Sequence, residues 1–186
     1  ARDPTVSDAP PIGVAVLGAG HWGPNLIRNF HDGPGSEVRW IVDRDAARRE
    51  AVTSRYPGAR ISDRVEDALR DGAVDAVVVA TPTATHHALA RAALEAGKHV
   101  LVEKPMATAA GEAAELCALA ERRGRVLMVG HVFLYNASVR YVKERLDRGD
   151  LGRVYYVSMT RTNLGPVRTD VNASWDLAAH DLSIVG

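Results

Sequence analysis

Two residues of complementary chemistry stand four positions apart in Asp176-Leu177-Ala178-Ala179-His180. On a helix, residues at this spacing project from one face, so the carboxylate of Asp176 and the imidazole of His180 would be neighbours. Because histidine titrates near neutral pH, such a pair suits general acid–base catalysis. The alternatives are a plain helix-surface pair or two zinc ligands. With no third ligand evident nearby, we expect no metal.

A lysine in the segment Glu103-Lys104-Pro105 is a second candidate for chemistry. The apolar run that ends at Val102 predicts a buried strand, and ligands of parallel α/β sheets bind outside the carboxyl ends of the strands. In that position Lys104 can donate a hydrogen bond to a substrate oxygen and stabilise charge as a carbonyl forms or is reduced. The alternative is a solvated surface lysine.

A glycine-rich loop, Gly18-Ala19-Gly20-His21-Trp22-Gly23, follows an apolar run and precedes a helical pattern with Pro24 in its first turn. In this context Gly-x-Gly-x-x-Gly indicates dinucleotide binding. The first glycine permits a tight turn, the second lets the backbone approach a pyrophosphate, and the third lets helix and strand pack closely. The helix N-terminus then favours the phosphates.

An acidic residue, Asp43, closes the next apolar run, 20 residues after Gly23. A carboxylate at this place accepts hydrogen bonds from the adenosine ribose hydroxyls. It also repels a 2′-phosphate, which favours NAD over NADP. The neighbouring Arg44 weakens that preference, because a guanidinium can stack on adenine or bind a phosphate. The alternative for Asp43 is a helix N-cap for the segment that follows.

Another segment that follows a predicted strand is Ala80-Thr81-Pro82-Thr83-Ala84-Thr85-His86. Thr81 and Pro82 would form a wall beside the nicotinamide ribose. The alternative is a capped helix start, with Thr83 or Thr85 as the cap. The residue types alone leave open whether His86 contacts the cofactor or is structural.

These residues must be positioned by an alternation of strands and helices that continues to residue 130. We expect strands at 12–17, 37–42, 59–61, 75–80, 98–102 and 125–129, and helices at 23–31, 44–56, 64–71, 84–96 and 108–123. Uniformly apolar runs suit strands covered by helices on both faces. The alternation therefore predicts an α/β fold, a Rossmann-type doubly wound parallel sheet.

The pattern changes after residue 130. We expect a helix at 138–148 with Val139, Val142 and Leu146 inward, an antiparallel strand at 154–162, a turn at 163–166 and a helix at 175–185. A single strand cannot form a sheet, so we interpret this region as the beginning of an incomplete α+β domain. The expected organisation is a disordered tail at 1–11, a dinucleotide-binding domain at 12–130 and a substrate and oligomerisation domain from 131 to 186.

Composition argues against several classes of partner. Lys and Arg number 23 and Asp and Glu number 23, and this balance gives no electrostatic footprint for nucleic acid or an anionic membrane. The apolar runs are too short for a membrane-spanning helix. The one cysteine, Cys117, is expected to be a buried apolar residue of a helix. It cannot form an internal disulfide, which favours a reducing, cytoplasmic compartment.

The sequence closely resembles the Gfo/Idh/MocA oxidoreductases, a family that includes glucose–fructose oxidoreductase and inositol dehydrogenase. The motifs that carry the resemblance are the glycine loop, Ala80-Thr81-Pro82 with His86, Ala96-Gly97-Lys98-His99-Val100 leading into Glu-Lys-Pro, and Asp-x-x-x-His. The resemblance covers residues 12–186. It implies hydride transfer between nicotinamide and a carbinol carbon of a sugar, nucleotide sugar or cyclitol. It also implies a homo-oligomer in the full-length form and a sheet that continues beyond this chain.

The resemblance also assigns roles. Lys104 would hydrogen-bond the reacting oxygen, Asp176 would orient substrate and lysine, and His180 would act as acid or base. Members of the family differ in whether the residue at the position of Lys104 or that of His180 moves the proton. The cofactor, NAD with NADP possible, would contact Gly18, Gly20, His21, Trp22, Gly23, Asp43, Arg44, Thr81, Pro82, His86, Glu103 and Lys104. Candidate substrate residues are His131, Asn136, Arg161, Asn163 and Arg168.

Two other classes of protein compete with this interpretation. A non-catalytic dinucleotide-binding module, or a truncated relative without efficient turnover, would need only the glycine loop and Asp43. A Rossmann-like methyltransferase would have no use for the Glu-Lys-Pro segment.

Overall fold

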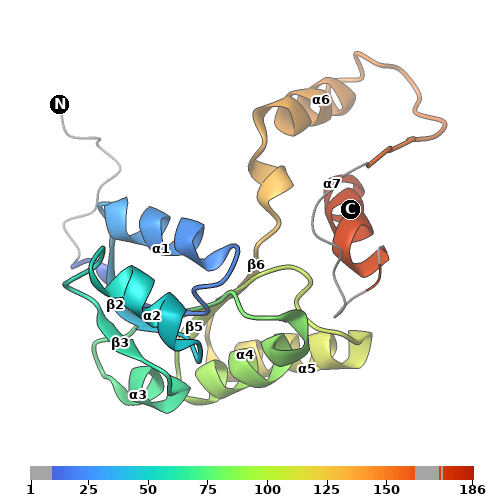
Figure 1. Cartoon of the computed structure of the whole chain (residues 1–186). Helices are drawn as coiled ribbons and strands as arrows, with labels where there is room; N and C mark the ends of the chain where they lie inside the picture. Colours follow the sequence, from blue (N-terminus) through green and yellow to red (C-terminus); the bar gives the residue numbers. More distant parts are fainter. Residues whose placement is uncertain (1–9, 162–171, 173) are drawn as a thin grey trace. The chain divides into compact units, whose positions relative to one another are not determined.

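The computed structural model describes residues 10–161, 172 and 174–186. The chain divides into two compact units, residues 1–129 and 130–186, and Figure 1 shows a layered α/β structure for the first. Each unit is described by itself.

The first unit is built on one parallel sheet with strand order β3-β2-β1-β4-β5-β6. The strands are β1 (Ile12–Leu17), β2 (Ser36–Val42), β3 (Arg60–Ser62), β4 (Ala76–Val79), β5 (His99–Val102) and β6 (Leu127–Val129). All five strand pairings are parallel. The order reverses between β1 and β4, which is the switch point where ligands bind in Rossmann folds. The predicted doubly wound sheet is confirmed.

Helices cover both faces of the sheet (Figure 1). They are α1 (Gly23–Asp32), α2 (Ala46–Thr53), α3 (Val65–Arg70), α4 (His86–Glu95) and α5 (Ala110–Arg123). One buried cluster joins the sheet to α1 and α2 through Ile27 and Val52, and the other joins it to α3, α4 and α5.

The alternation of side chains along β1 explains these two layers. Val14 and Val16 belong to the cluster under α1 and α2, whereas Ala15 and Leu17 belong to the opposite cluster. Successive side chains of a strand point to opposite faces, so a strand covered on both sides reads as a continuous apolar run. Each fully buried large side chain stabilises the fold by about 1.5–3 kcal/mol.

The regular secondary structure described in the second unit is helical. It contains η2 (Val132–Tyr135), α6 (Ala137–Asp147), the π-helical turn η3 (Ser174–Ala178) and α7 (Ala179–Val185). The strand expected at 154–162 is not formed, because residues 154–161 have no regular secondary structure. A strand requires a neighbour that completes its hydrogen bonds, and the described residues supply none here. The turn expected at 163–166 lies outside the described residues.

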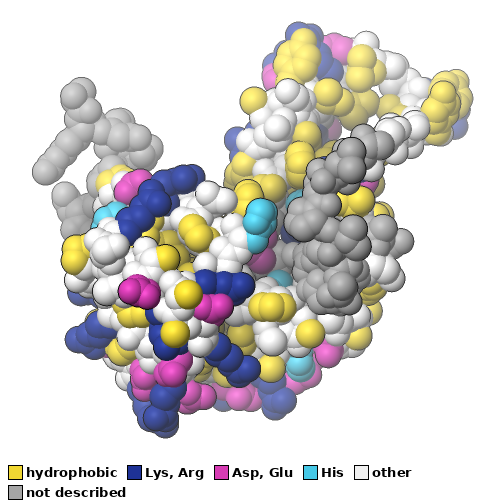
Figure 2. Space-filling model, in the orientation of Figure 1, with side chains coloured by type: hydrophobic (Ala, Val, Ile, Leu, Met, Phe, Trp, Pro, Cys, Tyr) yellow, Lys and Arg dark blue, Asp and Glu magenta, His cyan; other side chains and the backbone are white. Residues whose placement is uncertain are grey.

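The apolar face expected on α6 is not buried. Val142 is 50% exposed and Leu146 is 37% exposed. Figure 2 shows hydrophobic side chains gathered on the surface over α6, while charges of both signs are interspersed on the visible face of the first unit.

Cys117 is exposed, so the expectation that it is buried was wrong. The buried face of α5 consists of Leu116, Leu119 and Ala120, and the next residue along a helix is rotated by about 100° from its neighbour. Among the described residues, no helix combines the length and hydrophobicity that a membrane span requires.

Candidate functional site

The three glycines of the loop between β1 and α1 have separate structural roles. Gly18 has φ +98°, and an added Cβ would lie 2.6 Å from the carbonyl oxygen of Ala80. A Cβ on Gly23 would lie 2.0 Å from the carbonyl oxygen of Gly18. At Gly20 the nearest atom would be the flexible Nη1 of Arg48, at 3.3 Å. The first and third glycines therefore permit the turn and the close packing, and the second leaves backbone open to a ligand, as a dinucleotide pyrophosphate requires.

Asp43 follows β2 directly and ties the neighbouring loops together. Its Oδ2 accepts a hydrogen bond of 2.7 Å from the backbone N–H of Ala19, and its Oδ1 accepts one of 2.8 Å from the N–H of Asp45. The side chain is only 8% exposed. The N-cap of α2 is Asp45, which accepts from the N–H groups of Ala47 and Arg48, so the alternative interpretation of Asp43 as the N-cap was wrong.

A cation that the sequence reasoning missed lies beside this carboxylate. Nη1 of Arg48, on the first turn of α2, is 3.7 Å from Oδ2 of Asp43 and lies against Gly20. The sequence feature that could have identified Arg48 is its position in the first turn of the helix that follows Asp43. Arg44 is exposed next to Asp43.

His86 joins the loops that follow β4 and β5. The ring is buried, with Nδ1 2.8 Å from the carbonyl oxygen of Pro105 and Nε2 2.8 Å from that of Thr81. Both ring nitrogens are therefore used by the protein. Oγ1 of Thr81 is also hydrogen-bonded to Oγ1 of Thr85 at 2.7 Å, and the latter donates to the carbonyl of Pro82. These hydrogen bonds tie together the loops at the carboxyl ends of the two strands.

Glu103 follows β5, and its carboxylate lies between two predicted site residues. It accepts hydrogen bonds from the side chain of Trp22 in the glycine loop and from the backbone N–H of Lys104. Burial raises the pKa of Glu103, and the two hydrogen bonds together with the Lys104 charge offset part of that rise. Lys104 itself is half-buried. His21 and Trp22 are exposed on the loop, available to a ligand.

The second unit holds another group of predicted residues. His180 on α7 packs edge-to-face on Phe133 at a centroid distance of 4.8 Å. Arg161 donates to Oδ1 of Asp181 through Nε and Nη2, at 3.0 and 2.7 Å, and its guanidinium lies 4.6 Å from the Phe133 ring centroid. The structure thus gives Arg161, predicted to meet substrate, an internal ion pair.

Two further substrate candidates have defined surroundings. Burial lowers the pKa of His131, and its buried Nδ1 has no hydrogen-bond partner among the described residues. The side-chain oxygen of Asn136 accepts from the N–H groups of Ser138 and Val139 as the N-cap of α6. Asn163, Arg168 and the side chain of Asp176 lie outside the described part of the structure.

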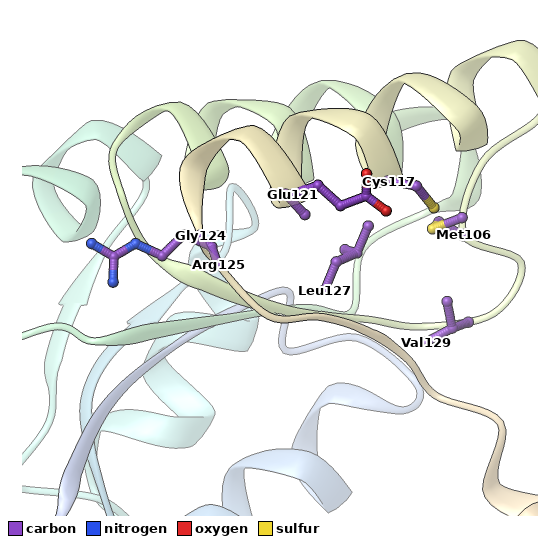
Figure 3. A pocket seen from close by; sticks show the side chains of 8 residues that line it. Met106, Cys117, Glu121, Gly124, Arg125, Leu127 and Val129 are labelled. Atoms are coloured by element: carbon purple, nitrogen blue, oxygen red, sulfur yellow. The ribbon is translucent and has the colours of Figure 1, made fainter.

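A cavity of about 350 Å³ lies elsewhere in the first unit, at the β6 edge of the sheet. Figure 3 shows side chains of α5 and β6 and the side chain of Met106 around it. The lining residues are Met106, Cys117, Ala120, Glu121, Gly124, Arg125, Leu127 and Val129. It does not include the glycine loop or Asp43. Within residues 10–161, 172 and 174–186, no three His, Cys, Asp or Glu side chains are grouped to hold a metal ion.

The first unit therefore has the glycine loop, the acidic strand end and the strand order of a dinucleotide-binding Rossmann domain. Residues 12–131 match the model of the oxidoreductase family with an NAD-binding Rossmann fold, GFO_IDH_MocA. The chain belongs to this Gfo/Idh/MocA family, as the sequence motifs predicted.

Individual relatives are similar to the chain over most of its length. A dTDP-3,4-didehydro-2,6-dideoxy-alpha-D-glucose 3-reductase of Actinomadura kijaniata is 32% identical over 182 residues, which cover 97% of this chain and 54% of that protein. The crystal structure of GenD2 from gentamicin A biosynthesis, in complex with NAD, is 36% identical, with a TM-score of 0.74, and the match covers 81% of this chain and 43% of that one.

A mutant 3-ketoreductase from Actinomadura kijaniata, in complex with TDP-benzene and NADP, is 34% identical with a TM-score of 0.71. The match covers 77% of this chain and 46% of that one. Members of similar fold therefore include one solved with NAD and one with NADP. The chain spans about half of the length, or less, of the curated relatives that it matches.

Proposed function

We propose that this chain acts in NAD(P)-dependent hydride transfer to or from a carbinol or carbonyl carbon of a sugar, nucleotide sugar or cyclitol. The observation that carries the proposal is the arrangement of the glycine loop, residues 18–23, and Asp43, which we call the cradle. In it the backbone at Gly20 is open to a ligand, and the Asp43 carboxylate is fixed at the end of the adjacent strand. The substrate class is supported by the relatives that act on dTDP-linked sugars.

The adenosine end of the dinucleotide would lie along the glycine loop. N–H groups at the start of α1 would bind the pyrophosphate, and Asp43 would accept from a ribose hydroxyl. Thr81, Pro82 and Glu103 would border the nicotinamide ribose. His86 is buried between Thr81 and Pro105, so we assign it to holding this wall and not to direct contact with the cofactor.

When bound, the nicotinamide would supply or accept the hydride. Lys104 would donate a hydrogen bond to the reacting substrate oxygen and stabilise its charge as the C–O bond order changes. His180 would take the hydroxyl proton during oxidation and return it during reduction. Asp176 would orient these groups, and His131, Asn136, Arg161, Asn163 and Arg168 are candidate substrate contacts.

We further propose that residues 131–186 begin the substrate and oligomerisation domain. The exposed apolar side chains of α6 and of residues 154–157 support this role, because such surface is normally covered. A cytoplasmic location is supported by the single cysteine, which leaves the chain without an internal disulfide.

Calorimetric titration of the chain with NAD tests the cofactor part of the proposal. Asp43→Ala should weaken binding, because it removes the ribose acceptor and the tie to Ala19. No binding by the unmodified chain would refute the assignment. The catalytic part is tested with reduced-cofactor fluorescence against sugars, nucleotide sugars and inositols. Turnover by Lys104→Ala at the unmodified rate would exclude the role of Lys104.

A further inference from the structure

The Arg48 guanidinium lies beside Asp43 and Gly20, where the adenosine end of a dinucleotide would bind. Nη1 is 3.7 Å from Oδ2 of Asp43, and it is the first atom that a Cβ on Gly20 would meet, at 3.3 Å. Asp43 marks the place of the ribose hydroxyls in this fold. Among the described residues, Arg48 is the one whose side-chain cation lies within 4 Å of the Asp43 carboxylate.

The negative charge of Asp43 is turned toward the protein backbone. Each carboxylate oxygen accepts one backbone N–H, from Ala19 and from Asp45, and only 8% of the side chain is exposed. Hydrogen bonds from N–H groups stabilise the anion and reduce the field that it presents to a ligand. This weakens the repulsion of a 2′-phosphate on which the expected preference for NAD depends.

The Arg48 donors remain available, in contrast to those of its neighbour. Nε of Arg48 is 3.9 Å from Oδ2 of Asp45 and Nη1 is 3.7 Å from Asp43, and both distances exceed those of hydrogen bonds. Its side chain is 52% exposed and donates no hydrogen bond within the described part of the chain. Arg49 instead donates through Nη1 to the backbone carbonyls of Asp43 and Arg44, at 2.8 and 2.9 Å.

We propose that Arg48 is a cofactor-specificity residue that donates to the 2′-phosphate of NADP, so that the site binds NADP as well as NAD. This inference rests on the proposed function, because it assumes a dinucleotide in the cradle. The planar guanidinium fork matches phosphate oxygens in a bidentate arrangement. The pyrophosphate has a separate set of donors, the N–H groups at the start of α1.

Calorimetric titrations of the unmodified chain and of Arg48→Gln with NAD and NADP test the inference. Arg48→Gln should weaken NADP binding about 10- to 100-fold, the range of a hydrogen bond to a charged group, and NAD binding by less than about threefold. Arg48→Lys keeps the positive charge but loses the planar guanidinium, so its affinity for NADP should lie between that of the unmodified chain and that of Arg48→Gln. Because half of the Arg48 side chain is exposed, these variants should keep the thermal unfolding midpoint of the unmodified chain.

The matched control is Arg123→Gln, which makes the same change in net charge. Arg123 is exposed in the last turn of α5, which ends just before β6 begins and so lies at the opposite edge of the sheet. This variant should leave both affinities unchanged. Titration with adenosine 2′,5′-bisphosphate against adenosine 5′-monophosphate isolates the 2′-phosphate from the nicotinamide, and Arg48→Gln should remove the advantage of the bisphosphate.

The outcomes separate this inference from the function on which it rests. Equal weakening of NAD and NADP by Arg48→Gln would place Arg48 on the shared pyrophosphate and overturn the inference, and so would no change in either affinity. Binding of NAD without NADP by the unmodified chain would overturn it while leaving the proposed function intact. If the unmodified chain binds neither dinucleotide, both proposals are wrong.

Discussion

Alanine substitutions at the three loop glycines should separate folding from cofactor binding. In Gly23→Ala the new Cβ would start 2.0 Å from the carbonyl oxygen of Gly18, so loop or helix must move by about 1 Å. Overpacking of this kind costs about 1–3 kcal/mol. In Gly18→Ala the new Cβ would lie 2.6 Å from the carbonyl oxygen of Ala80, and the residue would have to keep φ +98°. Even the left-handed helical region, which has a smaller positive φ, costs an L-residue about 1–2 kcal/mol.

Gly20→Ala meets only the flexible Arg48 tip at 3.3 Å. Its unfolding free energy should therefore stay within about 0.5 kcal/mol of that of the unmodified chain. The methyl group nevertheless occupies the surface at which the pyrophosphate approaches the backbone. We expect NAD binding at least about tenfold weaker, which corresponds to 1.4 kcal/mol.

Urea unfolding and calorimetric titration of the three variants provide the two measurements. A loss of 1 kcal/mol lowers the melting temperature of a chain of this size by about 2–4 °C, so thermal unfolding is an independent check. The reasoning fails if Gly20→Ala destabilises the fold as much as Gly23→Ala does. It also fails if Gly20→Ala folds normally and binds NAD as tightly as before.

Three further predictions concern other parts of the structure. The pKa of Glu103 is raised in the fold, so its contribution to stability is present below the unfolded pKa and is lost as pH rises through the folded pKa. Glu103→Gln should therefore flatten the dependence of the unfolding free energy on pH, measured by urea titrations at a series of pH values. An unchanged pH dependence would contradict this prediction. Trp22→Phe removes a hydrogen bond that lowers this pKa, so carboxyl NMR should show the pKa of Glu103 rising further, whereas a fall would exclude the contact. Asn136→Ala should lower the unfolding free energy of the second unit by about 1 kcal/mol through loss of the α6 N-cap, and Asn136→Asp, which can still cap, should retain most of it.

The parallel sheet, and the edge at which the carboxyl ends of its strands meet, could be predicted from the local sequence pattern. Val77, Val78 and Val79 form an uninterrupted apolar run because helices cover both faces of β4. The site residues that follow each strand then meet at one edge, since parallel strands share the direction of their carboxyl ends. These features depend on residues close together in the sequence and were predictable.

Features that depend on long-range contacts were not predictable in the same way. Whether Asp43 caps α2 depended on where the chain turned, and the cap proved to be Asp45. The contact of Arg48 with the glycine loop joins residues 28 positions apart and follows only from the pairing of β1 with β2. The strand expected from 154 to 162 depended on a partner strand, which the alternation of its own side chains could not supply.

The hydrogen bonds of Asp43 have a consequence for the entropy of binding. They fix the loops after β1 and β2 to each other, and Arg49 holds the carbonyls of Asp43 and Arg44. The proposed adenosine end of the site is thus held in place by hydrogen bonds within the protein, so association need not restrict these backbones further. In such a preorganised site, differences in affinity among ligands and variants should appear mainly as differences in dissociation rate.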